Sequence, residues 1–309
     1  MRLRLFAPRY WLTWAGLGLL RLLAFLPFGA IVHVGRGLGV VLRYLPLGFV
    51  GTARRNLELC MPELPPPARE RLLKEHFAGL GVALLEIPFV WWSRPERFAK
   101  LLRIEGAEHL HAALARGRGA IVLTAHFTSM EMAARALVTL TPAGFLYRPP
   151  KNEVIAYAFE RYRAVYGARG IPRDDIRAFI SALKHNECVW YAPDQSYRKK
   201  GAEMVPLFGI PAASNTLTSR LARVTGAPVL PYFFRRLPGT QGYVGVIHPP
   251  LENFPSECAV ADTARFYRMI EAQVRLVPEQ YLWIHRRFKG LSADYPDYYG
   301  RPAPRHTSP

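Results

Sequence analysis

Short apolar segments alternate with helix-forming segments from residue 107 to residue 276. The segments with the length and composition of strands are residues 120–125, 144–147, 188–192, 229–234 and 243–247. The segments with helical length and apolar spacing are residues 107–115, 129–140, 154–166, 176–184, 215–225 and 261–276. This alternation predicts an α/β fold with a layered, mixed and largely parallel sheet flanked by helices.

The N-terminal part of the chain is strongly apolar and helical in pattern. A proline-rich turn follows it, and Pro67 is well placed at the start of a helix over residues 68–92. We therefore expect two parts. Residues 1–60 would form a membrane anchor with juxtamembrane helices, and residues 61–309 an α/β domain whose tail from Tyr295 is irregular.

Residues 10–32 form a long apolar stretch that is interrupted by Arg21. A helix that spans a bilayer needs roughly 20 apolar residues, and an arginine at mid-membrane costs roughly 2.5–3.5 kcal/mol. Tyr10, Trp11 and Trp14 suit the aromatic belt of a membrane interface. A cleaved signal peptide is disfavoured because Arg21 breaks its apolar region. Two alternatives stay open, a single span and a helix lying in the interface.

Basic residues greatly outnumber acidic ones. The 41 Lys and Arg against 23 Asp and Glu give a formal net charge of +18, which favours nucleic acid, anionic lipid headgroups or an acidic carrier protein as partners. The arginines are scattered among apolar residues and no zinc-finger spacing occurs, so nucleic acid is disfavoured. The three cysteines, Cys60, Cys188 and Cys258, are far apart, so we expect neither a disulfide framework nor a metal site.

The first candidate for chemistry is the pair His126 and Glu131. If residues 121–125 form a buried strand and a helix starts at Thr128, His126 lies at the carboxyl end of the strand, where open α/β folds place their ligands. Glu131, in the first helical turn, would reach back to the imidazole ring. A histidine with an orienting carboxylate is the arrangement of a general base.

The same residues also have a purely structural interpretation. Residues 128–131, Thr-Ser-Met-Glu, form a capping box in which Glu131 satisfies a free backbone N–H at the helix start. His126 would then be a half-buried loop histidine. The spacing by itself leaves both interpretations open.

Two further strand ends carry polar residues. Arg148 follows the segment 144–147 and can bind a phosphate through both arms of its guanidinium, or it is a surface arginine before a proline turn. Asp194 follows the segment 188–192 and Pro193, where aspartate is also a common turn former. On the helix 154–166, Arg161 and Arg163 point to different faces, so only one of them can face a site on the sheet.

Residues 281–289, YLWIHRRFK, interleave aromatic with basic side chains. Such a segment suits a membrane headgroup interface, with rings at the boundary and cations on phosphates. Single-stranded nucleic-acid binding would use the same residue types.

In this order the blocks resemble the late acyltransferases of lipid A biosynthesis, most closely the lauroyl type, within the wider group that acylates lysophospholipids. The likeness covers most of the chain. The family pattern His-x-x-x-x-Asp/Glu matches at His126 and Glu131, and a further active-site arginine falls on Arg163. The other matching segments are residues 8–14, 55–60, 147–149, 190–194, 205–208 and 281–288.

The resemblance implies a membrane-bound enzyme of the bacterial inner membrane whose active site faces the cytoplasm. It would move a fatty acyl chain from acyl carrier protein to a 3-hydroxyacyl hydroxyl of a Kdo-bearing, doubly phosphorylated lipid A precursor, and it would need no cofactor besides that donor. His126 would be the general base, held by Glu131. Arg163 and Arg148 would bind phosphate or the oxyanion, and Asp194 would contact substrate.

Two alternatives remain at this stage. One is an acyltransferase that acts on a lysophospholipid or an aminolipid with the same His–Glu pair. The other is a basic membrane-associated protein that binds nucleic acid without catalysis. The sequence gives no indication of acyl chain length or oligomeric state.

Overall fold

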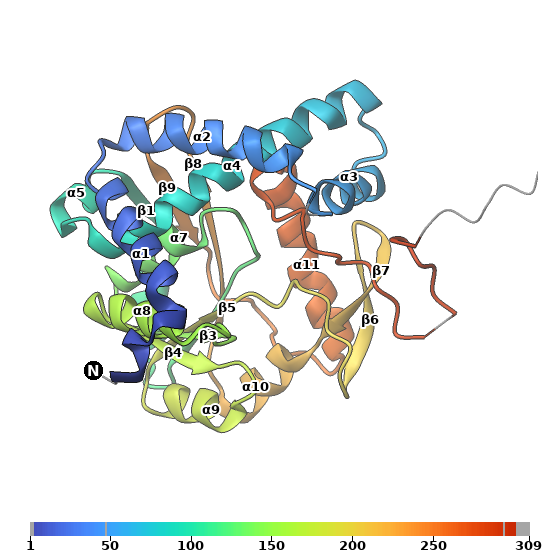
Figure 1. Cartoon of the computed structure of the whole chain (residues 1–309). Helices are drawn as coiled ribbons and strands as arrows, with labels where there is room; N and C mark the ends of the chain where they lie inside the picture. Colours follow the sequence, from blue (N-terminus) through green and yellow to red (C-terminus); the bar gives the residue numbers. More distant parts are fainter. Residues whose placement is uncertain (1–2, 47, 293, 301–309) are drawn as a thin grey trace, which may run out of the picture.

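The computed structural model describes residues 3–46, 48–292 and 294–300. A seven-stranded sheet runs through its centre with helices on both faces (Figure 1). A separate hairpin, β6 (Ala202–Leu207) and β7 (Ile210–Asn215), lies beside the last helix. In chain order the strands of the large sheet are β1 (Leu102–Glu105), β2 (Ala120–Leu123), β3 (Ala143–Tyr147), β4 (Ala168–Pro172), β5 (Cys188–Tyr191), β8 (Val229–Arg236) and β9 (Tyr243–Ile247).

Helices precede, connect and follow these strands. Asn152 and Asp175 cap two of them, since their side chains accept hydrogen bonds from backbone N–H groups of the first turn. In chain order the helices are α1 (Trp11–Leu23), α2 (Phe28–Tyr44), α3 (Phe49–Cys60), α4 (Pro66–Trp92), α5 (Pro95–Ala99), α6 (Ala107–Leu114), α7 (Met130–Val138), α8 (Glu153–Val165), α9 (Ile176–Lys184), α10 (Leu217–Thr225) and α11 (Ala259–Leu276).

The strand order is β1-β9-β8-β2-β5-β3-β4. All neighbouring pairs in it are parallel except β8 and β9, so the predicted mixed and largely parallel α/β sheet is confirmed. The expected strands and the expected helices from residue 68 onward are present, with ends shifted by no more than two residues. The strands β1, β4, β6 and β7 were not predicted, because they are short or partly exposed and lack an apolar run.

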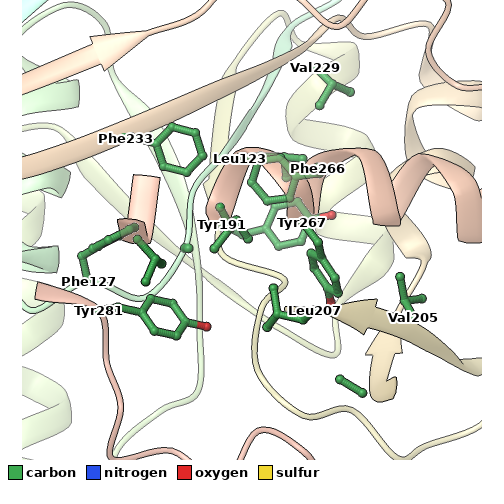
Figure 2. Packing of buried hydrophobic residues seen from close by; sticks show 14 of the residues in the cluster. Leu123, Phe127, Tyr191, Val205, Leu207, Val229, Phe233, Phe266, Tyr267 and Tyr281 are labelled. Carbon is green, nitrogen blue, oxygen red and sulfur yellow. The ribbon is translucent and has the colours of Figure 1, made fainter. Parts of the chain in front are cut away.

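Strand β2 shows how the sheet separates two apolar cores. Ile121 and Leu123 face one side, where α9, α10 and α11 pack, whereas Ala120 and Val122 face the side covered by α6 and α7. All four are buried, which is why this strand reads as a continuous apolar run. In Figure 2, Leu123 of the sheet lies beside aromatic side chains of α11. The side chains labelled in that view are Leu123, Phe127, Tyr191, Val205, Leu207, Val229, Phe233, Phe266, Tyr267 and Tyr281.

The apolar stretch 10–32 does not form one continuous helix. Helix α1 ends at Leu23, and α2 begins at Phe28 after a break at Pro27. Among the described residues, no single helix has the length and hydropathy needed to cross a bilayer. Within the described part of the chain, the pair α2 and α3, bent by 94°, meets both requirements together.

Helix α2 crosses α4 at very short range. A Cβ added to Gly39 would lie 2.0 Å from the carbonyl oxygen of Phe77, and one added to Gly81 would lie 2.0 Å from that of Gly35. Only glycine allows two backbones to approach this closely. Ile31 of α2 and Leu57 of α3 belong to the two apolar cores. The predicted division at residue 60 stays a prediction.

Candidate active site

His126 lies at the carboxyl edge of the sheet, on the turn after β2. Strand β2 pairs in parallel with β5, and Leu123 is opposite Tyr191. His126 and Asp194 each lie three residues beyond the end of their strand, and therefore at the same carboxyl edge of the sheet. The Nδ1 atom of His126 is 2.6 Å from Oδ1 of Asp194, and the backbone N–H of His126 donates to Oδ2 over 3.0 Å.

The Asp194 carboxylate is buried, with only 2% of its side chain exposed. The hydroxyl of Tyr281 also donates to Oδ2, over 3.1 Å. Burial by itself would raise the pKa of this carboxyl, but the His126 ring, the hydrogen bonds from His126 and the charge of Arg287 outweigh that effect and hold the pKa below its ordinary value. An ionised carboxylate can only accept, so Nδ1 of His126 donates to it, and in the neutral ring the lone pair is then on Nε2.

The segment 280–283 fixes the turn that carries His126. Phe127 and Tyr281 form an antiparallel bridge, the N–H of Thr128 donates to the carbonyl of Gln280, and the N–H of Leu282 donates to that of His126. The sequence interpretation of residues 281–289 as a headgroup interface is therefore wrong for the buried side chains of this segment, whereas Arg286 and Lys289 are exposed. The side chains of Tyr281, Trp283, Arg287 and Phe288 are buried.

Two basic residues of this segment act inside the fold. His285 accepts a hydrogen bond at Nε2 from the N–H of Ser196, and burial lowers the pKa of His285 to about 4, so its ring is neutral at pH 7. Arg287 donates to the carbonyl of Ala213, the hydroxyl of Ser214 and the hydroxyl of Tyr267. It thereby ties the 281–289 segment to β7 and α11.

A narrow cleft opens at this edge, with room for about one water molecule. His126 reaches it with one quarter of its side chain exposed. No described residue hydrogen-bonds to Nε2 of His126. The cleft can therefore admit a hydroxyl group to a histidine whose ring is held on its other side. It is lined by Asn56, Cys60, His126, Asp194, Gln195, Leu207, Phe208, Tyr281, Leu282, Trp283, His285, Arg287 and Phe288.

Glu131 does not hold the His126 ring in this structure. Both of its carboxylate oxygens accept hydrogen bonds from Arg163 of α8. Glu131 does lie in the first turn of α7, but Arg163 of α8 holds its carboxylate there, while β5 delivers Asp194 to the ring. The capping box is not formed either, since the helix cap is Ser129 and it makes no side-chain capping bond.

The remaining predicted residues fall into different environments. Arg163 is mostly buried, and it lies over the ring of Phe159. Arg148 and Arg161 are exposed. The hydrogen bond from Lys199 is the main cause that lowers the pKa of Asp174, and the charge of Arg148 adds a smaller effect. Asp194 lines the cleft and contacts His126 and Tyr281, and its expected contact with substrate stays a prediction.

Sequence reasoning missed Asn56, Tyr281 and His285 as cleft residues. One signal for the His126–Asp194 contact was present, because both residues follow a buried apolar run at the same offset. Using it required knowing that the two strands are neighbours. Among the described residues, no group of three or more His, Cys, Asp or Glu side chains is arranged to hold a metal ion.

The chain is similar to one protein family over nearly its whole length. A sequence model of the family described as bacterial lipid A biosynthesis acyltransferase matches residues 2–290. The lipid A biosynthesis palmitoleoyltransferase of Escherichia coli (strain K12) is 37% identical over 283 residues, which are 91% of this chain and 92% of that protein. The lipid A biosynthesis lauroyltransferase of the same organism is 36% identical over 293 residues, which are 94% and 96%.

Proposed function

The chain belongs to the bacterial lipid A biosynthesis acyltransferases, and from this premise we propose that it moves a fatty acyl chain from acyl carrier protein to a 3-hydroxyacyl hydroxyl of a Kdo-bearing lipid A precursor. Membership makes the protein an acyltransferase with a glycolipid acceptor. The donor, the Kdo sugar and the acylated position are parts of the proposal that rest on the family resemblance. The contacts of His126 support the proposed chemistry.

The observation that carries the proposal is the 2.6 Å contact between Nδ1 of His126 and Oδ1 of Asp194. An alcohol is a weak nucleophile at neutral pH, so a base must take its proton during attack. With Nδ1 protonated toward Asp194, Nε2 is the basic atom on the cleft side. We assign the orienting role, which we expected for Glu131 from the sequence, to Asp194.

The proposed reaction has two steps. Nε2 of His126 removes the acceptor hydroxyl proton while the oxygen attacks the thioester carbonyl carbon and forms the C–O bond. The tetrahedral intermediate then collapses, the C–S bond breaks, and the imidazolium returns the proton to the departing thiolate. Asp194 stabilises the imidazolium between the steps, in the way that a carboxylate supports histidine in other acyl-transfer enzymes.

Glu131 and Arg163 form the second element of the proposed site. Their ion pair is largely buried, which fixes the guanidinium between α7 and α8. A fixed cation beside the catalytic turn is suited to a phosphate or to the oxyanion of the intermediate. Arg148, exposed at the end of β3, is suited to a phosphate at the rim.

The proposal includes attachment to the inner membrane on its cytoplasmic side, through helix α1. Trp11, Leu12, Leu19 and Leu22 are exposed by 59–86%, so α1 carries an apolar face that no described residue covers. A helix of 13 residues spans roughly 20 Å, which favours lying in the interface over crossing it. Anionic lipid would add to the attraction, because the chain has a net charge of +18.

Mass spectrometry of lipid A tests the proposal. A bacterial host that lacks its own late acyltransferase should gain one secondary acyl chain on lipid A when it expresses this protein, and none with His126→Ala. Thin-layer analysis of the purified enzyme with a lysophospholipid acceptor covers the alternative substrate. Acylation of the lysophospholipid, with unchanged lipid A in the host, would contradict the proposed acceptor.

A further inference from the structure

Residues 55–60 and 281–288, two segments that lie about 230 residues apart in the sequence, are hydrogen-bonded to each other beside the cleft. The side chain of Asn56, on α3, donates from Nδ2 to the carbonyl of Trp283 over 2.6 Å and to that of His285 over 2.8 Å. Its Oδ1 accepts a hydrogen bond from the hydroxyl of Tyr299 over 2.5 Å. These bonds hold α3 and the segment after Trp283 in one fixed arrangement.

A basic groove follows from this junction. Arg54 and Arg55 on α3 and Arg286 on the C-terminal segment line an open depression, which we call the α3 groove. These three arginines outnumber the two acidic residues of the same lining, Glu58 and Asp297. The neighbours of these arginines, Asn56 and Arg287, line the catalytic cleft. The α3 groove and the cleft that contains His126 are therefore adjacent and share the wall formed by the junction.

The guanidinium groups of the α3 groove are incompletely neutralised. Arg55 pairs with Glu58 at 3.1 Å, and Arg54 reaches Glu70 only at 3.4 Å. Arg286 is exposed, lies 5.9 Å from the ring centre of Tyr299, and has no carboxylate partner among the described residues. Such a groove attracts an anion, and arginine suits phosphate because its planar fork donates two parallel hydrogen bonds.

The surroundings indicate that the anion belongs to a lipid. Next to Gly48 and Gly51, which line the groove, the end of α2 and the start of α3 expose Tyr44, Leu45 and Phe49 by 77%, 42% and 47%. The α3 groove thus borders an apolar surface and shares a wall with the cleft that contains His126. An amphipathic molecule can place its phosphate in the groove while its acyl chains contact the apolar surface.

We propose that the α3 groove binds a phosphomonoester on the sugar of the glycolipid acceptor, with Arg54, Arg55 and Arg286 as its ligands. This inference rests on the proposed function. It adds the position of the acceptor headgroup, and it makes Arg286 a specificity-determining residue. Fixing the phosphate in the groove leaves a hydroxyl on an acyl chain of the same molecule free to enter the cleft.

Vesicle binding tests the groove without any acyl transfer. Wild-type protein should bind phosphatidylcholine vesicles that contain phosphatidic acid, a lipid phosphomonoester, more tightly than vesicles that contain the same fraction of phosphatidylglycerol. The Arg54→Gln/Arg286→Gln variant should lose that difference, because its Kd for the vesicles with phosphatidic acid should rise about tenfold. The matched control is Arg71→Gln, an exposed arginine on α4 outside the groove, which should keep it.

Inorganic phosphate separates a lipid from a free anion as the ligand. Inorganic phosphate, added to the vesicle assay at a concentration far below that of the background salt, should leave the preference for phosphatidic acid intact. Tight binding of inorganic phosphate to the detergent-solubilised protein, lost in the double variant, would overturn the lipid assignment. Equal binding of both anionic vesicles by the wild type would overturn the groove as a phosphomonoester site.

Kinetics then connects the groove to the acceptor. With the phosphorylated precursor, Arg54→Gln/Arg286→Gln should raise the acceptor KM about tenfold while kcat and the donor KM stay unchanged. With an enzymatically dephosphorylated precursor, the variant and the wild type should be equal. An equal loss on both acceptors would show a structural effect and overturn the proposal. If neither protein acylates the precursor, the proposed function fails, whereas the vesicle result still decides the groove.

Discussion

His126 and Asp194 are separated by 68 residues in the sequence, and the atoms Nδ1 and Oδ1 of their side chains lie 2.6 Å apart. The contact arises because β2 and β5 are neighbours in the sheet although β3 and β4 lie between them in the chain. Asp194 is further held by Tyr281, and burial together with the charge of Asp194 keeps the pKa of Tyr281 well above its ordinary value. The tyrosine is thus a permanent donor, and it fixes the carboxylate that fixes the histidine.

Substitutions of Glu131 and Arg163 should have strongly coupled effects on the free energy of unfolding, because the two side chains form an ion pair. Breaking a largely buried pair leaves one charge without a partner, so Glu131→Gln should lower the free energy of unfolding by roughly 3 kcal/mol. Arg163→Met should cost a similar amount, and the double variant less than the sum, with a coupling of roughly 1–3 kcal/mol. Urea unfolding of the four proteins checks this, and additive losses would show that the pair does not form in solution.

Arg163→Lys should reduce turnover while keeping the positive charge. The ammonium group cannot reproduce the bidentate contact that the guanidinium makes with Glu131, and it cannot present a fork to phosphate or oxyanion. We expect kcat to fall by about tenfold, the effect of one charged hydrogen bond. Steady-state kinetics measures the change, and an enzyme with normal kcat and KM would remove Arg163 from the site and leave Arg148 as the candidate.

Replacing two different glycines of α2 with alanine should have opposite effects on stability. Gly39→Ala should destabilise the protein by roughly 1–3 kcal/mol, because the new Cβ would meet the carbonyl of Phe77 at 2.0 Å. A Cβ added to Gly37 would meet nothing within 4 Å, so Gly37→Ala should stabilise the helix by up to about 1 kcal/mol. Thermal unfolding of both variants is the measurement, and similar melting temperatures would contradict the close helix crossing.

Membrane attachment should depend on the exposed face of α1. Leu12 and Leu22 are 86% and 66% exposed, so replacing both with glutamate leaves the core unchanged but places charges where apolar contact is expected. The double variant should move from the membrane fraction to the soluble fraction of a cell lysate. Replacing the same leucines with methionine is the control and should leave the distribution unchanged. Full retention of the glutamate variant would assign attachment to another surface.

Acid should destabilise the folded chain through His76. Burial lowers the pKa of His76 to about 4, against a smaller opposing effect of its hydrogen bond to Glu279. As pH falls from about 6.5 to 4, the unfolded state takes up this proton before the folded state, so stability falls by up to about 1.4 kcal/mol per pH unit. His76→Asn should flatten that slope in urea unfolding, and His111→Asn, at an exposed position, should not. An unchanged slope in His76→Asn would contradict the burial effect.

The regular part of the fold was predictable because its helices and strands follow the apolar period of the sequence. The strand 229–234 and the helix 176–184 show this, since each buries a run or stripe that a local pattern reveals. Strand β4 was not predictable, because Arg169 and Gly170 are exposed on it and its pairing with β3 comes from the sheet and not from the sequence.

The site was predictable only in part, and for a physical reason. The position of His126 at a strand end is a local property, so the sequence located it. Its partner depends on which strands are neighbours, and local spacing therefore favoured Glu131 over Asp194. The same limit applies to Tyr281, whose aromatic and basic surroundings suggested a membrane surface although the structure buries it.

Acyl-transfer kinetics of Asp194→Asn tests the central claim most directly, with Glu131→Gln and His126→Ala measured beside it. Asparagine keeps the shape of the side chain but removes the charge that holds Nδ1–H and stabilises the imidazolium. Asp194→Asn should lower kcat by roughly 10²-fold or more with little change in the KM of either substrate, and combining it with His126→Ala should lower kcat little further, because the two residues act as one unit. Near-normal kcat in Asp194→Asn together with an inactive Glu131→Gln would contradict the account and return the orienting role to Glu131.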